Sequence, residues 1–480
     1  MKLKEIIKGI DCEIKGSAEV EVKEIQFDSR RVSQGTAFVA QRGTKVDGHD
    51  FIDGAVDAGA VAVVCEKWPK AIDKQVCYVK VSDCNTALGT MAANYYGHPS
   101  ESLKLIGITG TNGKTTTVTL LHRMFRNAGY HVGLVSTIVN KVDEEELPTS
   151  HTTPDALELN QLLRRMVDAG CQYCFMEVSS HAVVQQRIAG VTFCGGIFSN
   201  ITHDHLDFHK TMANYIAAKK GFFDGLSASA WALTNIDDKN GRVMVQNTKA
   251  KVNTYSLNSM ADFKCKIVEN TFEGMLLEIN GQQVSCPLVG RFNAYNLLAI
   301  YGAAVLCGIA EGEALRLLSM LHPAPGRFQY VRGRGITAIV DYAHTPDALQ
   351  NVISTIEGIR KSTQLLITVV GCGGDRDKTK RPEMAKIAAD GSDKLVLTSD
   401  NPRTENPDRI LDDMEAGLTP EELSHTVRIV DRRQAIRTAC MMAKEGDIIL
   451  IAGKGHETYQ EINGVRSHFD DIEEVKKQLE

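Results

Sequence analysis

The sequence predicts an α/β protein with three domains. A chain of 480 residues is longer than one ordinary hydrophobic core supports. Apolar strands alternate with helical patterns along most of that length, which is typical of a mostly parallel sheet covered by helices. Stretches rich in glycine and proline at 95–100 and 323–327 interrupt this alternation. We therefore expect domains at 1–98, 99–328 and 329–480.

Composition narrows the class of protein and its partners. With 43% hydrophobic and 24% charged residues, the chain has the make-up of a soluble globular protein. A formal net charge of -6 argues against nucleic acid as a partner, because nucleic-acid binding depends on basic surfaces. No apolar run approaches the roughly twenty residues that span a bilayer, and the N-terminus lacks a signal-peptide core. We expect a cytoplasmic monomer with no membrane partner.

The first two domains are predicted from short strands and the helices between them. Strands at 20–27 and 37–40, with a helix and a strand over 51–66, form a small α/β unit. The second domain starts with a strand at 104–109 and a helix at 115–128. It continues with a strand at 132–136, a helix at 156–169 and a strand at 173–178. This order predicts a mostly parallel sheet with helices on both faces.

In the third domain, polar clusters follow the predicted strands. Strands are expected at 336–340, 365–370, 394–397, 427–430 and 447–451. The polar clusters after four of them begin at Asp341, Gly373, Asp400 and Gly453. Parallel sheets bind ligands beyond the carboxyl ends of their strands, so we expect a ligand site at this edge.

A phosphate-binding loop is the strongest single motif. It follows the strand ending at Thr109, opens a helix, and consists of Gly110, Thr111, Asn112, Gly113, Lys114, Thr115 and Thr116. Glycines let backbone N–H groups converge on phosphate oxygens, the lysine supplies a cation, and the Thr115 hydroxyl is a candidate Mg²⁺ ligand. The loop is a variant, because the usual pattern has glycine where this chain has Ile108.

Two further residues are candidate metal ligands on chemical grounds. Glu177 ends a predicted strand, and His205 lies between Asp204 and Leu206 in a polar segment. A carboxylate and an imidazole near a phosphate loop suit a metal ion. A structural hydrogen bond explains the glutamate equally well, and an ordinary polar loop explains the histidine.

Six motifs occur in an order that resembles the Mur ligase family. They are GTNGKTT, MEVSSH, DHLD followed by Ala217-Ala218-Lys219, GRFNAYN, PGRF and DYAHTPD. The resemblance covers nearly the whole chain. It implies a uridine-nucleotide domain, a central P-loop ATPase domain and a Rossmann-like domain for the incoming amino acid. It also implies an ATP- and Mg²⁺-dependent ligase that adds meso-diaminopimelate to UDP-N-acetylmuramoyl-L-alanyl-D-glutamate through an acyl phosphate, in peptidoglycan synthesis.

The resemblance assigns roles in the ATP site. It implies that Lys114, Glu177, His205 and Lys219 are catalytic, and that Asn293 and His344 join the phosphate loop in binding ATP. The Mg²⁺ ligands would be Thr115, Glu177, His205 and Lys219, the last as a carbamate. A carbamate supplies oxygen ligands of the kind Mg²⁺ prefers, whereas an ammonium would repel the ion. For His344, a structural hydrogen bond is an open alternative.

The resemblance also assigns the substrate contacts. Those to the UDP-linked dipeptide would come from Phe27, Ser29, Thr152, Thr153, Ser179, Gln185 and Arg187. Those to diaminopimelate would come from Arg376, Asp400, Asn401, Pro402, Arg403, Gly453 and Glu457. Arg403 is expected to bind the second carboxylate, because its planar guanidinium group can form two parallel hydrogen bonds with a carboxylate. A surface arginine after a turn is the alternative.

Two departures from the family pattern bear on these assignments. Asn406 stands at a position that is usually acidic, and we expect it to act as a helix cap. The loop Thr44-Lys45-Val46 does not closely match a known uridine-binding pattern. Three rival functions stay open at this point: a lysine-adding ligase, a folyl-polyglutamate ligase, and a nucleotide-sensing protein without turnover.

Overall fold

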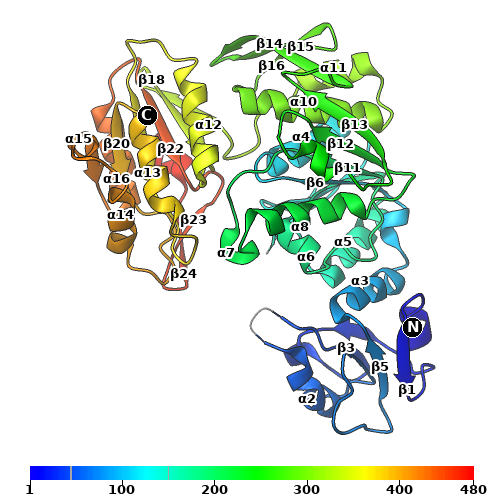
Figure 1. Ribbon diagram of the computed structural model, residues 1–480. Helices are drawn as coiled ribbons and strands as arrows, with labels where there is room; N and C mark the ends of the chain where they lie inside the picture. Colours follow the sequence, from blue (N-terminus) through cyan, green and yellow to red (C-terminus); the bar gives the residue numbers. More distant parts are fainter. Residues whose placement is uncertain (44–45, 150) are drawn as a thin grey trace.

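The computed structural model describes residues 1–43, 46–149 and 151–480, which form three domains (Figure 1). The N-terminal domain, in blue, lies below the central domain, and the C-terminal domain, in yellow to red, lies beside it. Most strands pair in parallel, and helices cover the sheets. The predicted α/β fold class with three domains is therefore confirmed. Within the described ranges, no helix is long and apolar enough to cross a bilayer.

The N-terminal domain has a five-stranded sheet in the order β1-β5-β4-β3-β2. Only β1 runs antiparallel to its neighbour. The strands are β1 (Cys12–Lys15), β2 (Glu24–Gln26), β3 (Thr36–Val39), β4 (Ala62–Cys65) and β5 (Cys77–Val81). The helical segments are α1 (Leu3–Ile6), η1 (Ser29–Arg31), η2 (Gly48–Phe51), α2 (Ile52–Asp57), α3 (Cys84–Tyr95) and η3 (Pro99–Glu101). The strand predicted at 20–27 is shorter than expected, because its first half makes only an isolated bridge.

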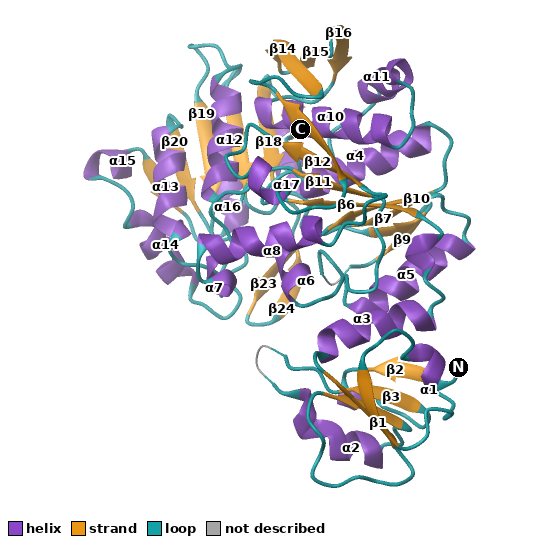
Figure 2. Cartoon of the chain, turned by 45° about the vertical axis from the view of Figure 1, so that its right-hand side comes forward, coloured by secondary structure: helices purple, strands orange, loops and turns teal. Residues whose placement is uncertain are grey.

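The central domain is built on a parallel sheet that carries the phosphate loop. Its parallel strands are β6 (Lys104–Thr109), β7 (Val132–Val135), β10 (Tyr173–Glu177), β11 (Gly195–Phe198), β12 (Trp231–Asn235) and β13 (Lys251–Ser256). One face packs on α4 (Lys114–Asn127), α10 (Arg291–Leu306) and α11 (Glu311–Ser319). The other face packs on α5 (Ala156–Asp168), α6 (Ser180–Val184), α8 (Met212–Asp224) and α9 (Gly241–Met244). Figure 2 shows these two helical layers.

Further strands, most of them antiparallel to their neighbours, extend this sheet at both edges and were not predicted. At one edge are β8 (Asn140–Val142) and β9 (Glu145–Leu147). At the other, β14 (Phe263–Thr271), β15 (Gly274–Ile279) and β16 (Gln282–Cys286) form a meander. The turn between β15 and β16 is Asn280-Gly281, and both residues have positive φ, as a two-residue hairpin requires.

The C-terminal domain has a six-stranded sheet in the order β17-β18-β22-β19-β20-β21. The strands are β17 (Gln329–Gly333), β18 (Ile336–Asp341), β19 (Leu366–Val370), β20 (Lys394–Leu397), β21 (Thr426–Arg428) and β22 (Ile448–Ala452), and a separate hairpin pairs β23 (Tyr459–Ile462) with β24 (Val465–His468). Helices α12 (Pro346–Glu357), α13 (Lys380–Asp390) and α14 (Pro407–Glu415) cover one face. The other carries α16 (Arg432–Met442) and α17 (Asp471–Leu479), and α15 (Pro420–Ser424) precedes β21.

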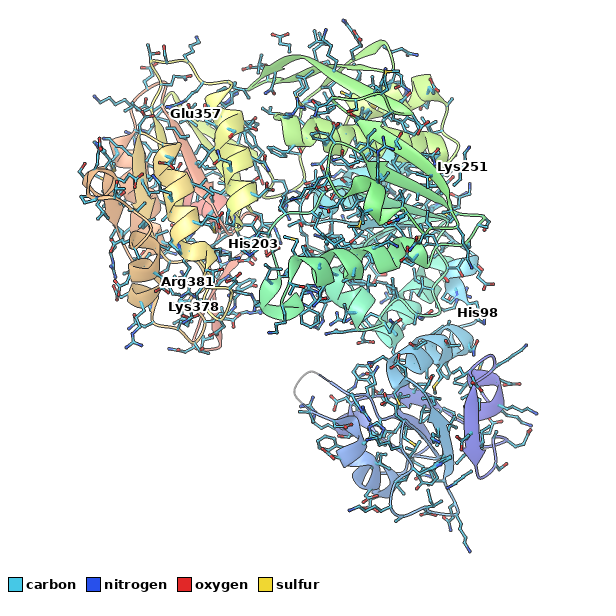
Figure 3. The ribbon with its side chains drawn as sticks, viewed as in Figure 1. His98, His203, Lys251, Glu357, Lys378 and Arg381 are labelled. Atoms are coloured by element: carbon cyan, nitrogen blue, oxygen red, sulfur yellow. The ribbon has the colours of Figure 1, made fainter. Side chains whose placement is uncertain are left out.

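The central and C-terminal domains meet where their parallel strands end. His203 precedes the short helix α7 (Leu206–His209) and lies at the edge of the central domain that faces the C-terminal domain (Figure 3). Across this boundary lie Lys378 and Arg381, at the start of α13. Both domains thus present the ends of their strands, where α/β proteins bind ligands, to the same boundary.

Candidate functional site

The phosphate loop connects β6 to α4, and two of its glycines cannot be replaced without strain. Gly110 and Gly113 have φ values of +154° and +86°, which side chains rarely adopt. A Cβ atom at Gly110 would lie 1.9 Å from Ser199 Oγ, and one at Gly113 would lie 2.4 Å from Asn296 Oδ1. The close packing of these neighbours fixes the shape of the loop.

Two lysine side chains meet at the loop. Lys114 Nζ donates hydrogen bonds to the carbonyls of Gly110, at 2.9 Å, and Thr111, at 2.8 Å. Lys219 Nζ, from α8, donates to the same Gly110 carbonyl at 2.6 Å. Lys219 is buried, and burial together with the charge of Lys114 lowers its pKa well below the ordinary value. Lys219 is therefore a buried amine whose environment shifts it toward the uncharged form.

Glu177 lies at the end of β10, beside β6 in the sheet. Its Oε1 accepts a hydrogen bond from the backbone N–H of Thr137 at 2.8 Å, and its Oε2 lies 3.2 Å from the Thr137 hydroxyl. That hydroxyl is also 3.0 Å from Thr152 Oγ1. Thr137 was not predicted as a site residue, and its sequence context carries no signal that would have identified it.

Five residues assigned to the UDP-linked dipeptide lie beside Glu177, and four of them form one network. Thr153 Oγ1 donates to the Glu177 carbonyl at 2.8 Å and accepts from the Ser179 backbone at 3.1 Å. Arg187 donates to the Thr153 carbonyl at 2.7 Å and to Gln185 Oε1 at 2.9 Å. The structure therefore brings Thr152, Thr153, Ser179, Gln185 and Arg187 together next to the phosphate loop.

The two residues predicted from the N-terminal domain are separate from this network. Phe27 is half-buried against the core of its own domain, and Ser29 begins η1, which Asp28 caps. Among the described residues, no hydrogen bond or ion pair joins Phe27 or Ser29 to the central domain. Thr44 and Lys45 lie outside the described residues, and Val46 is exposed.

His205 occupies the first position before α7 in a left-handed conformation, with φ of +55°. Its ring stands perpendicular to that of His181, with the centroids 5.0 Å apart, and its Nε2 is 3.3 Å from Asp204 Oδ2. In the described parts of the chain, no group of three or more His, Cys, Asp or Glu side chains is placed to hold a metal ion. A Mg²⁺ ion here would need phosphate oxygens as further ligands, which is usual for this ion.

The two other predicted ATP contacts, Asn293 and His344, come later in the chain than the phosphate loop. Asn293, in the first turn of α10, donates to the Val289 carbonyl at 2.8 Å and accepts from Asn296 at 3.2 Å. Asn296 is the residue that contacts Gly113. His344 follows β18, with its Nδ1 2.8 Å from the Tyr342 carbonyl.

Two contacts reach the phosphate loop from later in the chain, one from Asp347 in the C-terminal domain and one from Arg327 just before that domain. Asn112 Nδ2 donates to Asp347 Oδ2 at 2.7 Å, and Arg327 approaches the Thr115 hydroxyl at 3.3 Å. Neither Asp347 nor Arg327 was predicted as a site residue. Both stand inside motifs that were recognised, DYAHTPD and PGRF, which is the signal that could have identified them.

In the C-terminal domain, Arg403 and Arg376 flank the same glycine. A Cβ atom on Gly373 would lie 2.9 Å from Arg403 Nη1 and 3.9 Å from Arg376 Cγ. Arg403 has a positive φ of 51° and donates to the Gly374 carbonyl at 2.8 Å, while Gly374 also packs against the carbonyl of Pro402. Two guanidinium groups on adjacent loops suit a carboxylate ligand.

Acidic and amide groups lie beside these arginines. Asn401 Nδ2 donates a hydrogen bond to Glu457 Oε2 at 2.8 Å. Gly453 lies close to Asp400, because a Cβ atom on Gly453 would be 2.8 Å from Asp400 Oδ2. Burial, and then the neighbouring Asp400 carboxylate, raise the pKa of Glu457. Lys454 was not predicted individually, although it stands within a predicted polar cluster. It is fully enclosed among these groups.

Two buried arginines, Arg381 and Arg432, stabilise the loops that carry these residues. Arg381 donates to Glu405 at 2.8 Å, and Glu405 accepts from the backbone of Asp375 at 2.6 Å, so the loops that carry Arg376 and Arg403 are joined. On the other face, Arg432 forms an ion pair with Asp471 of α17 at 2.7 Å, with both side chains fully buried.

Arg432 also donates to two backbone carbonyls that directly precede residues of this cluster. One is that of Ser399, at 3.3 Å, immediately before Asp400, and the other is that of Ala452, at 3.0 Å, immediately before Gly453. The prediction for Asn406 is confirmed: it caps α14 by accepting from the Asp408 backbone at 2.8 Å.

Comparisons with known proteins agree with this arrangement. Three family descriptions match the chain: Mur ligase family, catalytic domain, over residues 21–96; Mur ligase middle domain over 108–304; and Mur ligase, glutamate ligase domain, over 326–455. The UDP-N-acetylmuramoyl-L-alanyl-D-glutamate–2,6-diaminopimelate ligase of Phocaeicola vulgatus is 56% identical over 478 residues, covering 99% of each chain.

A more distant relative and a solved structure extend the similarity. The ligase of the same name from Clostridium perfringens is 41% identical over 492 residues and covers 100% of both chains. A solved structure of a ligase with this name is 34% identical, with a TM-score of 0.70, covering 100% of this chain and 98% of the other. The chain belongs to the Mur ligase family.

Proposed function

We propose that this protein is the ligase that joins meso-diaminopimelate to UDP-N-acetylmuramoyl-L-alanyl-D-glutamate. The products would be ADP, phosphate and the UDP-linked tripeptide of peptidoglycan synthesis. The observation that carries the proposal is the meeting of two sites at one domain boundary: a phosphate loop, and a cluster that contains two arginines and the acids Asp400 and Glu457. The full-length relatives that bear this name support the same substrate pair.

Each domain would contribute one substrate. Residues 1–98 would hold the uridine nucleotide through Phe27 and Ser29, and 99–328 would hold ATP. Residues 329–480 would hold diaminopimelate. The dipeptide end of the first substrate would reach the network around Thr153 and Arg187, which lies beside Glu177. The working unit would be a monomer.

The reaction requires activation, because a carboxylate does not react with an amine in water. The D-glutamate side-chain carboxylate attacks the γ-phosphorus of ATP, ADP leaves, and an acyl phosphate forms. The amine of diaminopimelate then attacks the acyl carbon, loses a proton, and expels phosphate. Lys114 and the loop N–H groups would stabilise the charge on the transferring phosphoryl group.

Magnesium and a modified lysine would complete the ATP site. Mg²⁺, when bound, neutralises charge on the phosphates, and its protein ligands would be Thr115, Glu177, His205 and a carbamate on Lys219. The lowered pKa of the buried Lys219 amine supports this assignment, because only an uncharged amine reacts with CO₂ to give a carbamate and a proton. An unmodified lysine would not suit a cation site.

Arg403 would distinguish diaminopimelate from lysine. Diaminopimelate carries a second carboxylate where lysine has none, and Arg403 with Arg376 would hold it. Asp400, Asn401 and Glu457 would hold the adjacent ammonium group, with Pro402 and Gly453 shaping the pocket.

The test is phosphate release from ATP with the UDP-linked dipeptide and either meso-diaminopimelate or L-lysine. Strong preference for diaminopimelate is the expected result. Preference for lysine would keep the ligase and refute the role of Arg403. No stimulation of phosphate release by either amine would refute the proposed function.

A further inference from the structure

Lys454 has an enclosed side chain at the centre of the amino-acid pocket. It follows β22, and its side chain is 0% exposed. Its Nζ lies 3.0 Å from Asn401 Oδ1, 3.2 Å from Glu457 Oε2 and 3.7 Å from Asp400 Oδ1. All three neighbours are assigned above to the incoming amino acid, whereas Lys454 is not.

We propose that Lys454 is a positioning residue, which fixes Glu457 and Asn401 and leaves the pocket with one negative charge for the ammonium group of the incoming amino acid. The inference rests on the proposed function and deepens it. It implies that the pocket recognises a complete amino-acid centre, ammonium and carboxylate together.

Hydrogen bonds fix the direction of both partner side chains. Lys454 and the Glu461 backbone both donate to Asn401 Oδ1, so the amide nitrogen of Asn401 must point the other way, toward Glu457. Lys454 and Asn401 both donate to Oε2 of Glu457. Within the described residues, no side chain donates to Oε1 of Glu457, which is the oxygen that this arrangement offers to a ligand.

The charges in the pocket match one ammonium group. Asp400 and Glu457 carry two negative charges and Lys454 carries one positive charge, so one negative charge is left over. The neighbouring Arg432 does not change this sum, because Asp471 balances it. Arg403 and Arg376 lie beside the same pocket and complement a carboxylate. A zwitterionic amino-acid centre fits both features.

Lys454 therefore also controls the pH at which Glu457 is charged. Burial and Asp400 raise the pKa of Glu457, and the charge of Lys454 opposes this rise. The other groups that interact electrostatically with Glu457 are Tyr342, Arg432, Tyr459 and Arg466. Loss of the lysine charge would raise the pKa of Glu457 further, so the carboxylate would be protonated at a higher pH.

The experiment compares Lys454→Met with the wild-type enzyme across pH 6 to 9. We expect the KM for diaminopimelate at neutral pH to rise about tenfold or more, because a hydrogen-bonded charge is removed. The acidic limb of its pH profile should move up by about one unit. The KM for ATP should stay within about twofold. Lys477→Met is the matched control, since this lysine is exposed on α17.

Two further measurements keep the test decisive. If Lys454→Met does not fold, the double variant with Glu457→Gln removes both charges, and the single Glu457→Gln is its reference. Because Lys454 is inferred to act through Glu457, the second substitution should add less than about threefold to the KM. A large additive effect, or a folded Lys454→Met enzyme with the wild-type pH profile, would overturn the inference. The proposed function fails separately, if the wild type run alongside forms no product.

Discussion

Asn112 of the phosphate loop donates a hydrogen bond to the carboxylate of Asp347, 235 residues further along the chain, at 2.7 Å. Asp347 lies in the first turn of α12, so this bond ties the C-terminal domain to the loop that would hold ATP. The contact supplies a direct route by which the position of one domain affects nucleotide binding in another.

Removal of this bond should weaken the use of ATP. Hydrogen bonds to charged groups contribute about 1.5–3 kcal/mol, so Asp347→Ala is expected to lower kcat/KM for ATP about ten- to a hundredfold. Steady-state rates at varied ATP concentration measure the effect. Gln350→Ala, an exposed change on the same helix, is the control. Identical kinetics for Asp347→Ala and wild type would show that the contact does not contribute.

Arg403→Ala should raise the KM for diaminopimelate selectively. Loss of a charge-assisted pair worth about 1.5–3 kcal/mol predicts a rise of about ten- to a hundredfold, with the KM for ATP unchanged. Arg403→Lys keeps the charge but not the planar fork, and should recover only part of the loss. Arg409→Ala removes an exposed arginine from the following helix as a control. Equal rises in both Michaelis constants would contradict the role of Arg403.

Lys219→Ala should abolish turnover, and short carboxylic acids should partly restore it, because they can replace the oxygen atoms of a carbamate. The adjacent Lys220, which pairs with Asp224 at 2.6 Å, is a matched control, and Lys220→Ala should stay active. Mass spectrometry of the native protein, measured with and without added bicarbonate, tests for the modification directly. Full activity in Lys219→Ala would exclude the carbamate hypothesis.

His122 in α4 should make the protein less stable as the pH falls. It is buried, its Nε2 has no hydrogen-bond partner in the described structure, and burial lowers its pKa to about 4. Its pKa in the unfolded chain is about 6.5. The neutral form is therefore favoured by folding, and this stabilisation is present above pH 6.5 and lost progressively down to about pH 4.

The size of this effect follows from the shift in the His122 pKa. Each pKa unit corresponds to about 1.4 kcal/mol. The free energy of unfolding of the wild type should therefore fall by roughly 3 kcal/mol more than that of His122→Gln between about pH 6.5 and about pH 4. Urea unfolding at several pH values gives the difference, and the exposed His425→Gln serves as control. Parallel stability curves for wild type and His122→Gln would contradict the prediction.

The parallel cores could be predicted from the sequence because each βαβ unit is a local pattern. Several hairpins were not predicted, although two of them have Asn280-Gly281 and Asn463-Gly464 at their turns, with positive φ. Asn-Gly between short strands is a strong hairpin signal, but the neighbouring long apolar strands give a stronger sequence pattern than the short strands of these hairpins.

The contacts of Asp347 and Lys454 could not be predicted for a different reason. The bond from Asn112 to Asp347 depends on how two domains are oriented, which no local pattern specifies. Lysine is almost never fully buried, so nothing in the sequence marks Lys454 as an enclosed side chain. Only the arrangement of three polar side chains around it, from the loops after β20 and β22, makes the buried charge tolerable.

The ion pair between Arg432 and Asp471 has a consequence for synthesis of the chain. Arg432 donates hydrogen bonds to the carbonyls of Ser399 and Ala452, and its own position depends on the Asp471 carboxylate of α17. A buried arginine without its acid is strongly destabilising. During translation, the loops proposed to bind the amino acid can therefore take their final shape only after residue 471 has left the ribosome, well after the ATP-binding domain has emerged.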